Sequence, residues 1–267
     1  MSREECGERM RANSYMVIVG LLLCLSGQAV DLPPQPAETA PPKIREISSG
    51  EWTVGAIQLS KKDGTVSFPA RVNLTDGLLE YLLVHNTGKT HESLFSTDVP
   101  PYHLQIAMLL LGAKGADPKV LTNAPPSGPI NNADLLEFKP PPVPGDPVEL
   151  TVSWKSGNTN VVHPIESLVM SKKNGKAMRE GTWRFSGSMV WEGAFIAQIE
   201  GSVMAIITDI SAMFNSGHPE RDRDSLWYIR EKMLPPEKAP VTIKIKLLKK
   251  AETKKTGERP SKERDAN

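Results

Sequence analysis

The 267-residue chain is 39% hydrophobic, 24% charged and 6% aromatic, values that exclude a fibrous or wholly disordered protein. Its formal net charge is +1, and so balanced a charge gives no general electrostatic case for binding nucleic acid. The two cysteines, Cys6 and Cys24, lie near the N-terminus. The remainder of the chain can therefore form neither a disulfide nor a thiolate metal site.

The N-terminal segment is typical of an export signal. Residues 15–25 form an apolar run as long as the hydrophobic core of a signal peptide. The run is too short to cross a bilayer comfortably, because a membrane-spanning helix takes roughly 20 apolar residues. Gly27 and Ala29 are the small residues expected just before a cleavage site. The first nine residues carry two Arg and three Glu and so lack the positive charge of a signal-peptide start, whereas Met10 begins a segment of the proper shape. Translation is therefore expected to start at Met10.

We expect residues 1–29 to be a signal peptide and the protein to be exported, either periplasmic or secreted, with no transmembrane helix after cleavage. An uncleaved anchor is the alternative. Residues 30–49 are predicted to be a Pro-rich linker, and residues 249–267 a charged, disordered tail. From Lys244 onward the chain carries nine Lys or Arg against four Asp or Glu. Such a tail predicts at most a weak contact with anionic surfaces.

A single domain is expected over residues 50–248. Its first hairpin joins residues 55–59 to residues 66–72 through Asp63-Gly64, a strong turn signal. Residues 78–84 predict a buried strand, and residues 91–97 a strand that returns beside it after a turn. Residues 101–112 predict a helix that begins at a proline and ends at a glycine. It is apolar on nearly every side, so we expect it to be deeply buried.

The second half of the chain is again punctuated by short strands. Residues 125–147 contain eight prolines and predict a crossover without regular structure. A second helix, amphipathic, is expected over residues 219–233. Further strands are expected at residues 148–154, 161–170, 181–188, 189–200, 202–209 and 241–248. The absence of a βαβ rhythm favours a mainly β fold, an antiparallel sandwich or barrel-like sheet with two helices packed on it. An α+β fold is the alternative.

Histidine placement is the feature with chemical content. His85 and His91 bracket the predicted turn between two strands, and His103 begins the following helix. With Glu92 these residues would supply the nitrogen and oxygen ligands that suit zinc or a similar divalent ion. The competing interpretation is unrelated polar residues near loop ends. It gains weight because His91 and Glu92 would point to opposite faces of a strand.

Other motifs fail on spacing. Gly88-Lys89-Thr90 lacks the glycine of a phosphate-binding loop five residues earlier, and His91-Glu92 lacks the second histidine of a zinc protease. Asp209, at a predicted strand end, is either catalytic or the cap of the next helix. Trp154, Trp183 and Trp191 would line a ligand groove or pack in the core.

These observations favour a non-enzymatic domain that binds an unidentified ligand or protein in the cell envelope. The alternative is a metal-binding protein or metal-dependent enzyme that uses the histidine cluster.

Residues 80–112 resemble the YdjY-domain family of exported bacterial proteins. The resemblance rests on the HESL stretch, the prolines that follow it and the helix ending AMLLLG. Trp154, the FSGS stretch at residues 185–188 and EGSVMAIITD at residues 200–209 fit as well. The resemblance implies one domain over roughly residues 50–248 and an address outside the cytoplasm. It assigns no activity and no site.

Overall fold

The computed structural model describes residues 40–117, 142–179, 183–223 and 225–248. Within these ranges the chain is mainly β, with the α-helices α1 (Pro101–Leu111) and α4 (Ile196–Glu200), so the predicted fold class is confirmed. The described helices include none that is long and apolar enough to cross a membrane. The signal peptide, most of the Pro-rich linker, the centre of the Pro-rich crossover and the charged tail lie outside the described residues.

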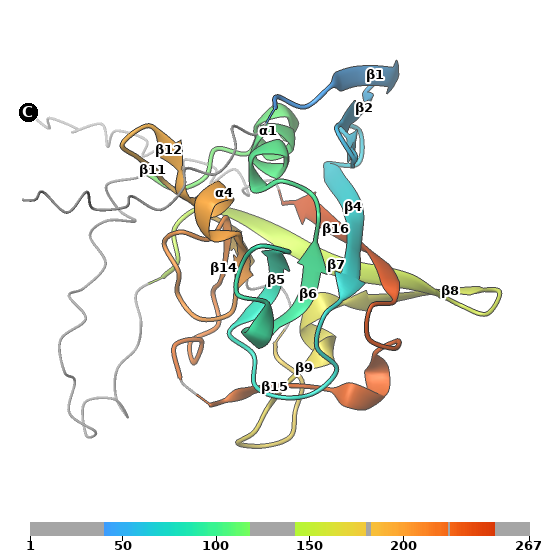
Figure 1. The fold of residues 1–267 in the computed structure, drawn as a ribbon, viewed down its shortest axis with the longest axis vertical. Helices are drawn as coiled ribbons and strands as arrows, with labels where there is room; N and C mark the ends of the chain where they lie inside the picture. The colour runs from blue at the N-terminus through green and yellow to red at the C-terminus, as the bar shows by residue number, and fades with distance from the viewer. Residues whose placement is uncertain (1–39, 118–141, 180–182, 224, 249–267) are drawn as a thin grey trace, which may run out of the picture. The chain divides into compact units, whose positions relative to one another are not determined.

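The main sheet closes on itself into a barrel of eight strands in the described part of the chain (Figure 1). Closure comes from β6, which pairs with β5 on one side and with β4 on the other. Around the barrel the order is β4 (Thr65–Val72), β16 (Pro240–Leu247), β7 (Asp146–Ser156), β10 (Trp183–Phe185), β14 (Phe214–Ser216), β13 (Ser202–Ala205), β5 (Tyr81–His85) and β6 (Ser93–Thr97).

The long strands follow the two-residue period of their sequences. β16 buries Val241, Ile243 and Ile245 and exposes the residues between them. Ile243 pairs with Phe68 of β4 on one side and Val152 of β7 on the other. Side chains of this kind belong to one continuous buried apolar cluster, and each such side chain stabilises the fold by about 1.5–3 kcal/mol relative to its exposed state.

Smaller elements extend the barrel. β1 (Ile44–Ser48), β2 (Glu51–Val54) and β3 (Ile57–Ser60) continue the sheet outward from β4, and β3 and β4 form the hairpin predicted at Asp63-Gly64. β1 thus lies within the range expected to be linker. The remaining elements are β8 (Thr159–Pro164) beside β7, the pair β11 (Val190–Trp191) and β12 (Ala194–Phe195), the pair β9 (Val169–Ser171) and β15 (Trp227–Ile229), and the 3-10 turns η1 (Thr90–Glu92), η2 (Ile165–Leu168) and η3 (Glu231–Met233).

Helix α1 forms where it was predicted. Pro101 occupies its first turn, and Gly112 ends it in the left-handed conformation with φ 99°. Its inner side, including Leu104 and Met108, is buried in the main apolar cluster. On the outer side, Tyr102, Leu109 and Leu110 are exposed, Leu109 by 51%. The expectation of deep burial is therefore wrong for the outer face of the helix, because only the inner face rests on the sheet.

The expected turn between residues 78–84 and 91–97 is not a hairpin. β5 and β6 run parallel, with Tyr81 opposite Ser93 and His85 opposite Thr97. Residues 86–92 form a short crossover that carries the chain back along the pair. β13 and β14 are parallel in the same way, and residues 206–213 form their crossover. The four strands are adjacent in the barrel in the order β14, β13, β5 and β6, and the two central strands, β13 and β5, pair antiparallel. Both crossovers therefore join strands of the same part of the barrel.

The second predicted helix is also wrong. Residues 219–233 contain β15 and η3 instead, and β15 pairs with β9. Trp227 and Ile229 are buried there, so tertiary pairing overrides the helical periodicity of the segment. Residues 196–200, expected to be strand, form α4, which ends at Gly201 in the left-handed conformation.

Candidate functional site

The four residues proposed as metal ligands do not meet in one place. His91, in the exposed η1 turn, has its Nε2 3.7 Å from Oε2 of Glu92. His85 contacts the Thr87 hydroxyl at 2.8 Å, and the His103 Nε2 atom lies 3.1 Å from the Ala40 carbonyl. Among the described residues no group of three or more His, Cys, Asp or Glu side chains is arranged to hold a metal ion.

The parallel crossover explains this separation. His85 lies at the carboxyl end of β5, beside Thr97. His91 precedes β6, whose first residue lies beside Tyr81 at the opposite end of the pair. An antiparallel hairpin would have made the two histidines neighbours, whereas parallel pairing places them a strand length apart.

The same crossover builds a different polar cluster. Because the carboxyl ends of parallel strands meet at one edge of a sheet, Asn86 after β5 and Asp98 after β6 lie together. The Asn86 amide donates to Asp98 Oδ1 at 2.6 Å. Arg71 reaches the other carboxylate oxygen from β4, through its Nη2 atom. Burial lowers the pKa of the neighbouring His85, although the Asp98 charge acts in the opposite direction.

Two surface hollows meet at Arg71, and we refer to them together as the Arg71 groove. They measure about 380 and 280 Å³, and Arg71 lines both. Asn73, Asn86, Thr90, Ser96, Glu237 and Lys238 line the first, whereas the second contains His103 and Asp98. The Arg71 and Asp98 side chains are about half exposed. The groove therefore contains solvent-accessible cations and amides together with two carboxylates, and most of these groups are paired with one another.

The walls of the groove are fixed from both sides. The Asn73 amide donates to the carbonyls of Thr90, at 2.5 Å, and Ser93, at 2.7 Å. This holds the end of the first crossover against β4. On the far side the Lys238 amide donates to the Val72 carbonyl at 2.9 Å. A preformed wall reduces the ordering that a ligand would otherwise have to impose.

A second polar chain links the two crossovers. Tyr81 as a residue is only 1% exposed. Its hydroxyl donates to Asp209 Oδ2 at 2.9 Å and accepts from Lys89 Nζ at 2.7 Å. Burial, and then the charge of Asp209, raise the pKa of Tyr81 far above its usual value, so the phenol stays neutral. Lys89 belongs to the first crossover and Asp209 to the second. The chain therefore ties the loops together across the β5–β13 pair.

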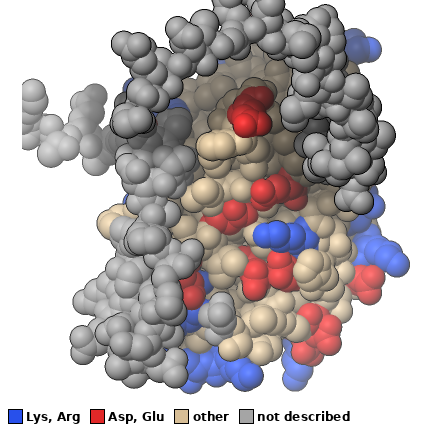
Figure 2. All heavy atoms as spheres, turned by 60° about the vertical axis from the view of Figure 1, so that its left-hand side comes forward, with Lys and Arg blue, Asp and Glu red and all other residues tan. Residues whose placement is uncertain are grey.

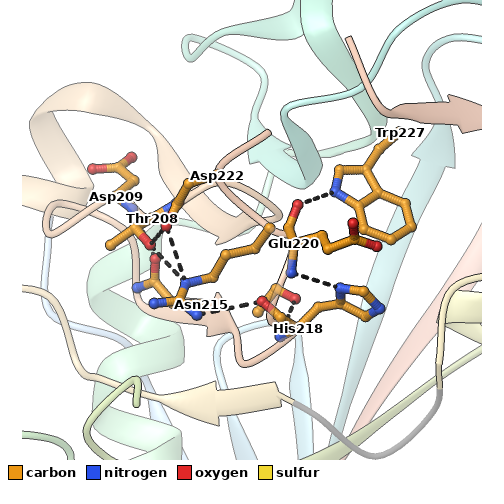
Figure 3. Close-up of polar contacts among 9 residues, drawn as sticks. Thr208, Asp209, Asn215, His218, Glu220, Asp222 and Trp227 are labelled. Carbon is orange, nitrogen blue, oxygen red and sulfur yellow. Dashed lines mark hydrogen bonds and ion pairs between the residues drawn. The ribbon is translucent and has the colours of Figure 1, made fainter. Parts of the chain in front are cut away.

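Asp209 also begins a third network, drawn in Figure 3, within residues 208–227. The Asp209 amide donates to Asn215 Oδ1 at 2.9 Å. Asp222 accepts from the amide of Thr208, at 2.6 Å, and from its hydroxyl, at 3.0 Å. Arg221, 3% exposed, donates to the same hydroxyl at 2.8 Å. These groups are turned toward one another, so the network stabilises the loop.

His218 completes this network (Figure 3). Its Nδ1 accepts the Glu220 amide at 3.1 Å, and its ring lies edge-on to Trp227 with centroids 4.7 Å apart. Burial lowers the pKa of His218, the positive charges of Arg179 and Arg221 lower it further, and Glu220 acts in the opposite direction. The neutral imidazole is therefore the form that the fold accommodates.

The remaining candidates have mainly structural positions. Asp209 caps a turn, by accepting the Ser211 amide at 2.8 Å, rather than a helix. Trp183 is fully buried in the core, and Trp154 lies almost buried against His163 with ring centroids 5.2 Å apart. Trp191, in contrast, is exposed.

Charged side chains of both signs lie on the possible ligand surfaces. On the face drawn in Figure 2, Asp and Glu side chains gather near the middle, and Lys and Arg are more frequent toward the edge. In the Arg71 groove, Arg71 is paired with Asp98, and Lys238 Nζ lies 3.7 Å from Glu237 Oε1. No local sequence signal marks the Arg71 groove, because β4 and β6 meet only when the barrel closes.

Comparison with known proteins gives one match. Residues 57–246, from β3 through β16, match the family model described as the YdjY domain, which confirms the resemblance carried by residues 80–112. Searches of curated proteins and of solved structures gave no significant match.

Proposed function

The chain belongs to the YdjY domain family, and from this premise we propose that it is an exported, non-enzymatic binding domain of the cell envelope. Its ligand carries a carboxylate and occupies the Arg71 groove. The arrangement of Arg71, Asp98 and Asn86 between two open hollows carries this proposal. The apolar run at residues 15–25, followed by small residues, supports export.

The barrel interior argues for binding on the surface. It is filled by the continuous apolar cluster that includes Phe68, Val152 and Ile243, as in barrels of this strand number whose side chains fill the lumen. The Arg71 groove opens at the surface of the domain. Its first hollow is lined largely by polar side chains, whereas Gly, Ala, Pro and Val residues make up most of the lining of the second. A charged group of a ligand would therefore be recognised in the first hollow, by hydrogen bonds and charge.

The chemistry of the groove favours a carboxylate. A guanidinium presents its donors as a planar fork that matches a carboxylate. Asp98 and Asn86 hold one side of this fork in place, and the lining also contains Lys238, which is ion-paired with Glu237. Among the hydrogen bonds of the described residues, neither lining hydroxyl, Thr90 or Ser96, is paired with a histidine or carboxylate base. This supports binding rather than nucleophilic catalysis.

Binding can be tested with a matched pair of probes. N-acetylalanine, with a free carboxylate, is expected to shift the side-chain NMR signals of Arg71 and Asn86 in the full chain, whereas N-acetylalaninamide is not. Arg71→Gln should abolish the response, and Arg45→Gln, on the exposed strand β1, should leave it unchanged. Equal responses to both probes, or a full response in Arg71→Gln, would contradict the proposal. Export is tested separately by cell fractionation with and without residues 1–29.

A further inference from the structure

The hairpin of β7 and β8 carries an open sheet edge. β8 pairs with β7 on one side, and no other strand of the described residues pairs with it. Figure 1 shows this hairpin projecting toward the right of the view. The outer edge of β8 therefore presents main-chain hydrogen-bonding groups to which another strand can bind.

The loop of the hairpin determines which groups face outward. Ser156 pairs with Thr159 across a two-residue loop, whose first residue, Gly157, has φ 58°. In such a hairpin the two flanking residues exchange main-chain hydrogen bonds, and from there antiparallel pairs alternate between bonded and non-bonded. Every second residue from Thr159 thus bonds to β7. The N–H and C=O groups of the residues between, Asn160 and Val162, point away from β7.

Pro164 marks the end of this open edge. It occupies the next outward position, where it has no N–H to offer, and its carbonyl accepts the Ser167 hydroxyl at 2.7 Å. Asn160 is exposed, and Val162 is 56% exposed. The groups available to a further strand are therefore those of Asn160 and Val162.

The edge strand β1, in contrast, is protected against pairing. It carries Arg45 and Glu46, and its register with β2 shifts between Glu46 and Ser48. In a two-fold antiparallel pair centred on Arg45 or Glu46, like charges would lie opposite each other, which is destabilising. Such charges and irregularities commonly protect sheet edges. β8 carries no Lys, Arg, Asp or Glu, and its register with β7 is regular.

The open edge of β8 is complementary to itself. When two copies meet about a two-fold axis at Val161, Asn160 of each copy lies opposite Val162 of the other. These residues face outward, so each pair can exchange both of its main-chain hydrogen bonds. Trp154 pairs with Val161, so the two copies form a row of apolar side chains across the axis. Lys155 pairs with Asn160 and lies in line with uncharged residues of the second copy.

We propose that β8 pairs antiparallel with β8 of a second copy and so joins the two main sheets. A second copy fits this edge because the pairing uses the outward groups of Asn160 and Val162 and opposes no like charges. This inference goes beyond the proposed ligand binding and does not involve the Arg71 groove. The contact is small, so the dimer is reversible and depends on concentration.

Sedimentation equilibrium of the full chain in a density-matched detergent tests the association. The average mass is expected to rise from that of a monomer to that of a dimer as the protein concentration increases. Val162→Pro removes an outward N–H that the pairing with β7 does not use, and should weaken the association by at least about tenfold. Val162→Thr keeps the N–H and a β-branched side chain, so this control should associate unchanged. Circular dichroism checks that both variants fold.

Disulfide cross-linking tests the register in chains that carry Cys6→Ala and Cys24→Ala. An equimolar mixture of Asn160→Cys and Val162→Cys chains should form intermolecular disulfides, because these positions lie opposite each other with Cα atoms about 5.5 Å apart. Either variant alone should form several-fold fewer, because its two cysteines lie more than about 7 Å apart, too far for a disulfide.

Three outcomes would overturn the proposal. A mass that stays monomeric at every concentration would show that the edge does not pair. Association that is unchanged in folded Val162→Pro would place the contact elsewhere on the chain. Equal cross-linking in the mixture and in the single variants would exclude this register, and that result stands even if Val162→Pro does not fold. None of these measurements involves carboxylate binding at Arg71, so the two proposals fail independently.

Discussion

Replacing Tyr81 by phenylalanine removes a single hydroxyl from the bridge between the two crossovers. The aromatic ring remains in its buried place, so the change leaves no large cavity. Asp209 loses the donor at 2.9 Å, and Lys89 loses the acceptor at 2.7 Å. The second carboxylate oxygen of Asp209 retains the Ser211 amide. The substitution therefore isolates the contribution of the phenol.

The expected loss of stability follows from these contacts. A hydrogen bond to a charged group contributes about 1.5–3 kcal/mol, which we assign to the partly buried Asp209. Lys89 is exposed, so its bond adds little, at most about 1 kcal/mol. Tyr81→Phe should thus reduce the free energy of unfolding by about 2–3 kcal/mol. In a domain of this size that lowers the Tm by about 5–10 °C.

Urea unfolding followed by circular dichroism measures this change. The midpoint should fall while the m-value stays constant. Tyr102→Phe, at an exposed tyrosine, is the control and should change stability by less than about 0.5 kcal/mol. In a double-mutant cycle, Tyr81→Phe and Asp209→Asn should be non-additive by about 1–2 kcal/mol. A loss no larger than that of Tyr102→Phe, or full additivity, would refute the bridge.

The pKa of His218 is lowered in the fold, so as the pH falls the histidine is protonated in the unfolded chain before it is protonated in the folded one. The stability present above about pH 6.5 should therefore decline below that pH. Urea midpoints measured across this range should decline less in His218→Gln than in the unsubstituted protein. Gly145→Ala should prevent folding or destabilise severely, because φ is 121° and a new Cβ would overlap the Phe185 carbonyl. Gly157→Ala, where the space is open, should reduce stability by only about 1 kcal/mol. Thermal unfolding followed by circular dichroism compares the two glycine variants, and equal losses of stability would contradict the steric argument. Addition of zinc or of a chelator should leave the Tm of the full chain unchanged. A specific zinc site, at a free zinc concentration 100 times its Kd, would instead stabilise the folded state by about 2.7 kcal/mol.

Local pattern determined much of this protein. Three features could be predicted from the sequence because each depends on residues close together in the chain. They are the alternation in β16, the Asp-Gly turn between β3 and β4, and the proline and glycine at the ends of α1. The resemblance over residues 80–112 added the family, which the match over residues 57–246 confirms. The fold class followed from the count and rhythm of short strands.

Tertiary structure decided what local pattern left open. The sequence from His85 to His91 is compatible with a hairpin, and only the pairing of β6 with both β5 and β4 makes it a parallel crossover. That choice separates the histidines and brings Arg71, Asn86 and Asp98 together from three strand ends. Residues 219–233 carry a helical period, but burial of Trp227 against β9 makes part of them a strand. Strand direction and partner depend on contacts far apart in the chain, so the sequence alone predicted many of the elements but neither their pairing nor the groove, which only the closed barrel located.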